Sequence, residues 1–246
     1  MSDRKLATGM EGLDTLFMGG IPARSAFLVY GPPFIGKEQL VRNFAVECLR
    51  HGIPAVFITT DNPSTQLREE LTQLDAKYPT YEANGLVRYI DIFSMSIGVT
   101  EKDKYTEYVP SPMDLAAINL ALNKAQQMVM GKHMHHLIIL DSLTTLITNT
   151  NASTVFRFVQ ILKGRTKNAG ATTLFVMGAG VHPESEVQLF KGIMDGVMEF
   201  KEEPRDSKLY IRLQGFGEVK SRNWVEYRLE KNRIDVTGAF EIGRIR

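Results

Sequence analysis

The sequence predicts an α/β fold in which a mostly parallel central sheet is flanked by helices and followed by antiparallel C-terminal strands. Two observations support this prediction. Between Ser25 and Met177, short apolar runs alternate with segments of helical period, which is typical of parallel strands joined by helices. From Gly196 onward, short strand-like segments follow one another directly, as in hairpins. No linker or low-complexity tract interrupts the chain, so we expect one domain over residues 1–246.

Apolar runs and helical periodicity place the individual elements. The expected buried strands are Ser25–Tyr30, Ala55–Thr60, Leu86–Phe93, Leu137–Leu140 and Thr172–Met177. The expected helices are Gly12–Phe17, Lys37–Arg50, a segment from the 61–64 turn to Asp75, Pro112–Met130 and Thr154–Asn168. The expected antiparallel strands are Val197–Phe200, Lys208–Leu213, Trp224–Leu229 and Arg233–Val236. The polar segment Gly178–Lys191 is expected to be a mobile loop.

Composition and charge exclude several classes of protein. The formal net charge is +1, so there is no general attraction to nucleic acid or to anionic membranes. Cys48 is the only cysteine, which excludes a disulfide framework and a cysteine-rich metal site. The N-terminus lacks the apolar core of a signal peptide, and no apolar run has the length of a membrane span. We therefore expect a cytoplasmic protein without membrane contact.

The segment from Leu28 to Leu40 has the organisation of a phosphate-binding loop. A short apolar run ends at Gly31, a tight loop follows, and Gly36-Lys37 opens an amphipathic helix, as in G-x-x-x-x-G-K-[ST] between a strand and a helix. Amide groups and the helix dipole favour an anion at this helix start, and Lys37 can reach the outer phosphates. The predicted nucleotide-binding residues are Gly31, Pro32, Pro33, Phe34, Ile35, Gly36, Lys37, Glu38 and Gln39.

Two carboxylates are candidate ligands for Mg²⁺. The apolar run 137–140 ends at Asp141, where P-loop proteins hold a metal-side aspartate; the alternative is that Asp141 caps the next segment. Glu38 stands where a Ser or Thr hydroxyl is expected, and it either reaches the metal or turns outward and favours the helix N-terminus. Without a metal, a carboxylate about 5 Å from a phosphate costs roughly 3 kcal/mol at an effective dielectric near 20.

Further motifs occur in order on either side of this loop. Thr8–Asp14 and Gly19–Pro22 precede it, and Val56–Thr59, Ile90–Phe93 and Asp141–Leu146 follow it. Over nearly the whole chain, this ordered set resembles the RecA superfamily ATPases related to the circadian protein KaiC. The resemblance implies a RecA-like P-loop core, ATP or ADP as the ligand with Mg²⁺ as its companion ion, and oligomers in which nucleotide lies between neighbouring subunits.

Departures from the family pattern affect the residues that the resemblance assigns to hydrolysis. The family carries two glutamates after the second strand, one of which activates the attacking water, and Asp61 and Asn62 occupy these positions. Asp61 is therefore the candidate catalytic base, although its side chain is one methylene shorter; the alternative is an ordinary turn residue. The replacement of the metal-binding hydroxyl by Glu38 is a second change among the residues that the resemblance assigns to hydrolysis.

The family also places a Lys-x-Arg element in the late strands, where it contacts the γ-phosphate of the neighbouring subunit. In this sequence Gln214–Phe216 stands at the matching position, so both cations are missing. Lys220 and Arg222 lie nearby and are the candidate substitutes. A cation supplied in trans stabilises the charge of the transferring phosphoryl group, and its loss slows turnover by several orders of magnitude.

These features predict a KaiC-like, RecA-fold ATP-binding protein with weak or absent hydrolysis, which acts as a regulatory or assembly component in a homo-oligomer or with a protein partner. The alternatives are a slow Mg²⁺-dependent ATPase and a DNA-binding RecA paralogue. In recombinase relatives the segment around His182 touches DNA, but here Glu184 and Glu186 oppose phosphate, so nucleic acid is not an expected partner.

His133, His135 and His136 form a histidine cluster before the fourth expected strand. No cysteine or carboxylate nearby completes a set of zinc ligands. We therefore expect a solvated loop rather than a metal site.

Overall fold

A computed structural model describes residues 4–99, 103–131, 133–205, 207–231 and 233–237, so both ends of the predicted 1–246 domain lie outside the described residues. The strands are β1 (Lys5–Leu6), β2 (Ile21–Pro22), β3 (Ala26–Gly31), β4 (Ala55–Thr59), β5 (Val87–Asp91), β6 (Thr106–Tyr108), β7 (His136–Asp141), β8 (Ala171–Gly178), β9 (Gly196–Glu203), β10 (Lys208–Gly215), β11 (Val225–Glu230) and β12 (Arg233–Asp235). The helices are α1 (Glu11–Leu16), α2 (Lys37–Arg50), α3 (Ser64–Leu74), α4 (Tyr78–Ala83), α5 (Leu115–Met130), α6 (Leu143–Asn149), α7 (Ala152–Asn168), α8 (Glu184–Ile193) and the short 3₁₀ helix η1 (Ser94–Ile97).

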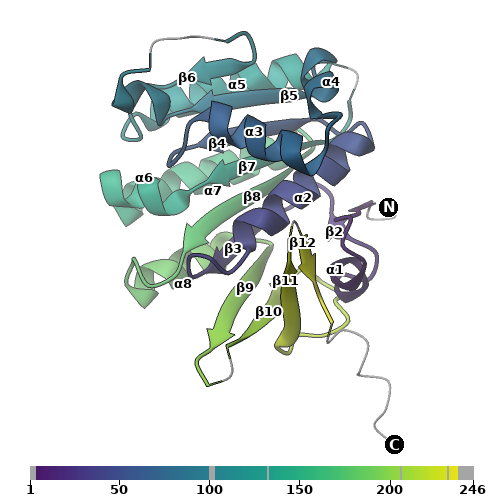
Figure 1. Ribbon diagram of the computed structural model, residues 1–246. Coiled ribbons are helices and arrows are strands. Elements are labelled where there is room, and N and C mark those ends of the chain that lie inside the picture. Colours follow the sequence, from purple (N-terminus) through teal and green to yellow (C-terminus); the bar gives the residue numbers. More distant parts are fainter. Residues whose placement is uncertain (1–3, 100–102, 132, 206, 232, 238–246) are drawn as a thin grey trace, which may run out of the picture.

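Within the described part of the chain, ten strands form one sheet in the order β12-β11-β10-β9-β3-β8-β7-β4-β5-β6 (Figure 1). Along the sheet from β9 to β6, each strand is parallel to the next. At the other end, β9, β10, β11 and β12 pair antiparallel. Strand β3, which leads into the predicted phosphate-binding loop, lies inside the sheet between β9 and β8. The predicted fold class is confirmed.

Alternate residues of the buried strands pack on opposite faces of the sheet, as a period of two requires. Phe57 and Ile139 pack with α1 to α4, and Ile58 and Leu140 pack with α5 to α8. The sheet is thus covered by helices on both sides, which explains why its central strands are apolar throughout. None of the described helices combines the length and the hydrophobicity that a membrane crossing needs.

The expected mobile loop at Gly178–Lys191 is wrong for most of its length, because α8 occupies Glu184–Ile193. Val187 and Phe190, three residues apart, are buried against the α5–α8 side of the sheet. Two acidic residues in the first turn, directly after Pro183, are a helix-start signal that the polar composition of the segment obscured. Helices α4 and α6 and strand β6 were likewise not predicted.

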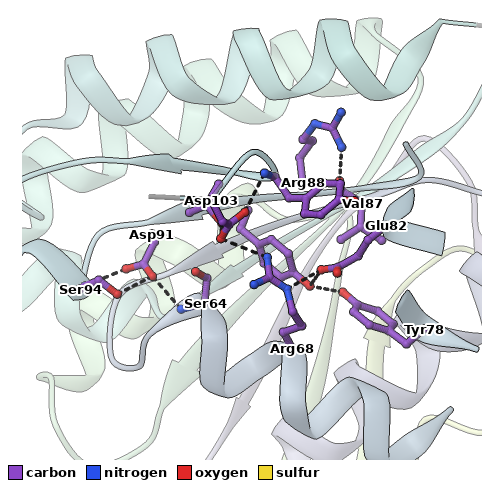
Figure 2. Close-up of polar contacts among 12 residues, drawn as sticks. Ser64, Arg68, Tyr78, Glu82, Val87, Arg88, Asp91, Ser94 and Asp103 are labelled. Atoms are coloured by element: carbon purple, nitrogen blue, oxygen red, sulfur yellow. Dashed lines mark hydrogen bonds and ion pairs between the residues drawn. The ribbon is translucent and has the colours of Figure 1, made fainter. Parts of the chain in front are cut away.

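A network of charged and aromatic side chains joins α3, α4 and β5 (Figure 2). Arg68 on α3 donates to Glu82 on α4 at 2.7 Å, and its guanidinium lies over the Tyr89 ring, 4.9 Å from the centroid. The Tyr89 hydroxyl donates to the same Glu82 oxygen at 2.7 Å, and Asp103 forms a second ion pair with Arg68. These contacts attach α3, whose N-terminus borders the candidate site, to the edge of the sheet.

Buried His136 contradicts the solvated loop expected for the histidine cluster, because β7 begins at His136 rather than at Leu137. Its ring is fully buried and its Nε2 lies 2.9 Å from the amide nitrogen of Gln126 on α5. Burial, aided by the nearby His135, lowers the pKa of His136 from 6.5 to about 4. The folded protein therefore holds this imidazole neutral at neutral pH.

Because the unfolded chain binds this proton near pH 6.5 and the folded chain near pH 4, the free energy of unfolding should fall as the pH is lowered between these values. The full difference is about 3 kcal/mol. We expect His136→Gln, which keeps a partner for Gln126, to flatten this dependence in urea unfolding. His51→Gln, at an exposed histidine, should keep the wild-type slope. Equal slopes for His136→Gln and wild type would contradict the assignment.

Candidate functional site

The predicted phosphate-binding loop forms one tight turn between β3 and the N-terminus of α2. Phe34 and Gly36 have positive φ angles of 62° and 86°. A Cβ atom at Gly36 would lie 2.2 Å from Leu229 Cδ2, and one at Gly31 would lie 2.7 Å from Phe200 Cβ. Close packing therefore requires glycine at position 31, whereas the left-handed backbone favours glycine at position 36, where the exposed Leu229 side chain could move aside.

The two unusual residues of the loop lie in opposite surroundings. Phe34 is 95% exposed, whereas Ile35 is 2% exposed and belongs to the core on the α1–α4 side. The Tyr227 hydroxyl of β11 donates to the Ile35 carbonyl at 2.6 Å, and Gln39 donates to the Glu230 carbonyl at 3.2 Å. The hairpin β11–β12 thus holds the loop and the start of α2, a contact that the sequence did not predict.

Lys37 is almost completely buried at the start of α2. Its ammonium group donates to the Pro32 carbonyl at 3.1 Å and to Glu38 Oε1 at 2.5 Å. The cation therefore lies against the loop, where a bound phosphate would be expected, but its charge is matched by a neighbouring carboxylate. Neither of the two alternatives weighed for Glu38, metal ligand or outward-facing residue, included this ion pair.

Asp141 ends β7 and faces a cavity of about 130 Å³ between α2, α3 and the sheet. The cavity is lined by Glu38, Val41, Arg42, Phe57, Ile58, Thr59, Asp61, Asn62, Leu67, Glu70, Ile139 and Asp141. Burial, together with the negative charges of Glu38 and Asp61, raises the pKa of Asp141 to about 7. A bound cation would relieve this repulsion between carboxylates, which makes the cavity chemically suited to one.

The predicted base Asp61 lies in the same cavity, but its carboxylate is engaged by hydroxyl groups. Ser142 donates to Oδ2 at 2.8 Å, and Thr145 and Thr60 donate to Oδ1, the latter at 3.1 Å. Both oxygens therefore already accept hydrogen bonds from the chain that follows β7. This arrangement explains the position of Asp61 without a catalytic role, and the sequence did not identify its three hydroxyl partners.

Phe216, which ends the segment that should carry the trans cations, packs against the core instead. The Phe216 ring lies 4.9 Å from that of Phe17 and 4.6 Å from that of Phe27, measured between centroids. The substitute Arg222 donates to the carbonyls of Gly215 and Gly217, at 3.1 and 2.7 Å. Its guanidinium therefore holds the turn after β10.

Comparison with known proteins adds to this geometry. A family model described as "ATPase: KaiC" matches residues 6–236. The chain belongs to the KaiC ATPase family. Among curated relatives, a UPF0273 protein of Methanopyrus kandleri is 30% identical over 183 residues, covering 74% of this chain and 70% of its own. A UPF0273 protein of Pyrococcus horikoshii is 28% identical over 182 residues, covering 72% and 70%.

The fold likeness extends to a solved structure. A KaiC-like protein of Pyrococcus horikoshii matches 95% of this chain and 99% of its own with a TM-score of 0.73, at 18% sequence identity. At that identity the likeness concerns the fold alone. The resemblance to KaiC-related ATPases inferred from the motifs is confirmed, and so is the mostly parallel sheet with antiparallel C-terminal strands.

The cavity beside the loop offers oxygen ligands to a divalent cation. No cluster of three or more His, Cys, Asp or Glu side chains capable of holding a metal occurs among the described residues. Mg²⁺, however, is commonly held by one or two carboxylates, with water and phosphate oxygens completing the octahedron. Glu38 and Asp141 supply two carboxylates to the same cavity. Thr59 adds a buried hydroxyl group that lacks a hydrogen-bond partner, and the sequence did not identify it as a site residue.

Proposed function

We propose that this KaiC-like domain binds ATP or ADP at the loop from Gly31 to Gln39 and hydrolyses ATP weakly or not at all. The observation that carries the proposal is the loop itself. Its glycine-dependent turn leads into α2, while Phe34 points to solvent and Ile35 into the core, so neither replaces a phosphate beside Lys37. Mg²⁺ would bind at Glu38 and Asp141 and neutralise phosphate charge.

Weak hydrolysis follows from the altered parts of the site. Asp61 accepts hydrogen bonds at both oxygens, so its carboxylate is held by Ser142 and Thr145 instead of being free to orient an attacking water. Phe216 packs in the core, and Arg222 is bound to backbone carbonyls. The alternative, a slow Mg²⁺-dependent ATPase, needs Asp61 to leave its hydroxyl partners, whereas the binding function needs no such rearrangement.

The role that fits these features is that of a regulatory or assembly component, a cytoplasmic single-domain protein acting in a homo-oligomer or with a protein partner. An apolar ring such as Phe34, exposed beside a nucleotide, is available for contact with a neighbouring subunit. DNA is not part of the proposal, because Lys191 of α8 is paired with Glu199, and Glu184 and Glu186 precede it.

Isothermal titration with Mg-ATP and Mg-ADP tests the binding function, and phosphate release measured on the same protein tests turnover. We expect heat of binding at micromolar to millimolar nucleotide together with little or no phosphate release. Absence of heat and of any thermal shift at millimolar nucleotide would overturn the binding function. Phosphate release that disappears in both Lys37→Ala and Asp61→Ala would instead establish the slow ATPase.

A further inference from the structure

The ion pair between Lys37 and Glu38 is unusual because consecutive residues of a helix do not face each other. Lys37 nevertheless folds back so that its Nζ lies 2.5 Å from Glu38 Oε1 and 3.1 Å from the Pro32 carbonyl. The Lys37 side chain is 4% exposed and that of Glu38 is 32% exposed. Water therefore screens this contact only from the glutamate side.

This contact opposes phosphate binding in two ways. The carboxylate uses the lysine donor that a polyphosphate needs, and it places a negative charge where the phosphates would gather. At an effective dielectric near 20, such a charge at about 5 Å lowers anion affinity by roughly a hundredfold. A nucleotide can use Lys37 fully only after Glu38 has moved away.

The adjoining cavity offers Glu38 a second position. Thr59 and Asp141 are direct neighbours in the parallel pairing of β4 with β7, and both lie on the α2 side of the sheet, in line with Phe57 and Ile139. Thr59 is 5% exposed, and its Oγ1 has no hydrogen-bond partner. A buried, unpaired hydroxyl beside a carboxylate is a costly arrangement unless a ligand completes it.

The positive charges of Arg42 and Lys37 act on Asp141, but each of these cations is already paired with another carboxylate. Arg42 lines the cavity, but it is paired with Glu70 on α3 at 2.8 Å. Apolar side chains form part of the cavity wall, but Asp141 and Thr59 add a carboxylate and a hydroxyl, oxygen ligands of the kind that hard divalent cations prefer. A hydrated Mg²⁺ or Mn²⁺ ion bound here would satisfy these groups and attract Glu38.

We propose that Glu38 is a metal-operated latch on Lys37: a divalent cation held by Glu38 and Asp141, next to the Thr59 hydroxyl, draws Glu38 away and so frees the Lys37 ammonium group for nucleotide phosphates. The latch rests on the proposed nucleotide binding, and it requires that the metal binds before the nucleotide. A Ser or Thr at this position would impose no such order, because a hydroxyl does not neutralise the lysine.

The test compares ADP affinity with and without metal in the full-length protein and in Glu38→Gln. In a chelating buffer, Glu38→Gln should bind ADP about a hundredfold more tightly than wild type, because the competing charge is gone. With Mg²⁺ present, this difference should largely disappear. Glu38→Thr, which restores the family's hydroxyl, should behave like Glu38→Gln in the chelating buffer.

A readout without nucleotide tests the metal site directly. Electron paramagnetic resonance should show Mn²⁺ binding to nucleotide-free wild type and weaker binding to Glu38→Gln. Glu69→Gln is the matched control, since Glu69 is an exposed residue of α3 outside the cavity lining and its loss removes the same charge. This control should match wild type in both experiments.

Three results would overturn the latch: equal ADP affinity of wild type and Glu38→Gln in the chelator, no Mn²⁺ binding to nucleotide-free wild type, or the same effect from Glu69→Gln. In each of these cases ADP binding itself would still be measured, so the proposed function would stand. If neither wild type nor Glu38→Gln binds ADP, with or without Mg²⁺, the proposed function fails together with the latch.

Discussion

Replacing Lys37 with alanine is expected to lower the affinity for Mg-ADP by roughly a thousandfold. The loop provides this cation at the buried start of α2, in contact with the Pro32 carbonyl. Two unit charges about 4 Å apart interact by about 4 kcal/mol at an effective dielectric near 20, which corresponds to that loss in affinity. Titration calorimetry measures the change, and circular dichroism verifies that the variant remains folded.

Lys124→Ala serves as the control for general loss of positive charge. Lys124 is an exposed residue of α5 that pairs with Glu107, and α5 covers the face of the sheet opposite to α2. Its replacement should leave the affinity for Mg-ADP unchanged. If both variants lose the same affinity, or if Lys37→Ala loses none, the phosphates do not bind at this loop.

The second large effect concerns Asp91, which ends β5 and is completely buried. Its carboxyl oxygens accept hydrogen bonds from the Ser64 amide and from the Ser94 hydroxyl, both at 2.7 Å (Figure 2). They also accept from the amides of Phe93 and Ser94, at 3.0 and 2.8 Å. One side chain thus joins the start of α3 to the turn that begins η1.

Asp91→Ala should reduce the free energy of unfolding by about 4 kcal/mol, because several buried donors lose their acceptor at about 1–3 kcal/mol each. Urea unfolding measures the loss. Asp114→Ala removes a carboxylate that accepts from the Ala117 amide at the exposed start of α5, and it should cost only about 1 kcal/mol. Equal losses for the two variants would show that Asp91 contributes no more to stability than an exposed helix-capping carboxylate.

The main elements of the fold were predictable because burial leaves a simple pattern. The apolar runs around β3, β4, β7 and β8 have no polar face, as expected for strands covered by helices on both sides. Helix α8 was missed because only Val187 and Phe190 of its residues are buried, too few to dominate its polar composition. The burial of Val187 and Phe190 becomes evident only from their packing against the neighbouring helices and strands.

The candidate site was predictable as a loop but not as a set of contacts. Lys37 and Asp141 follow from local motifs, since each occupies a known position relative to a strand end. The hydrogen bond from Tyr227 to Ile35 joins residues 192 positions apart. The Lys37–Glu38 pair contradicts the usual divergence of adjacent helical side chains. Long-range packing and side-chain conformation determine both contacts, and neither leaves a periodic signal.

The hairpin β11–β12 packs directly against the predicted phosphate-binding loop, so these two parts of the chain, distant in sequence, should move together. Leu229 and Ile234 both approach Gly36, and Tyr227 holds the carbonyl before it. A displacement of this hairpin is therefore transmitted directly to the loop, without passing through the eight other strands of the sheet. A ligand or partner that binds the β11–β12 edge, far from β4 and β7 in the sheet, would therefore be able to change the conformation of the loop.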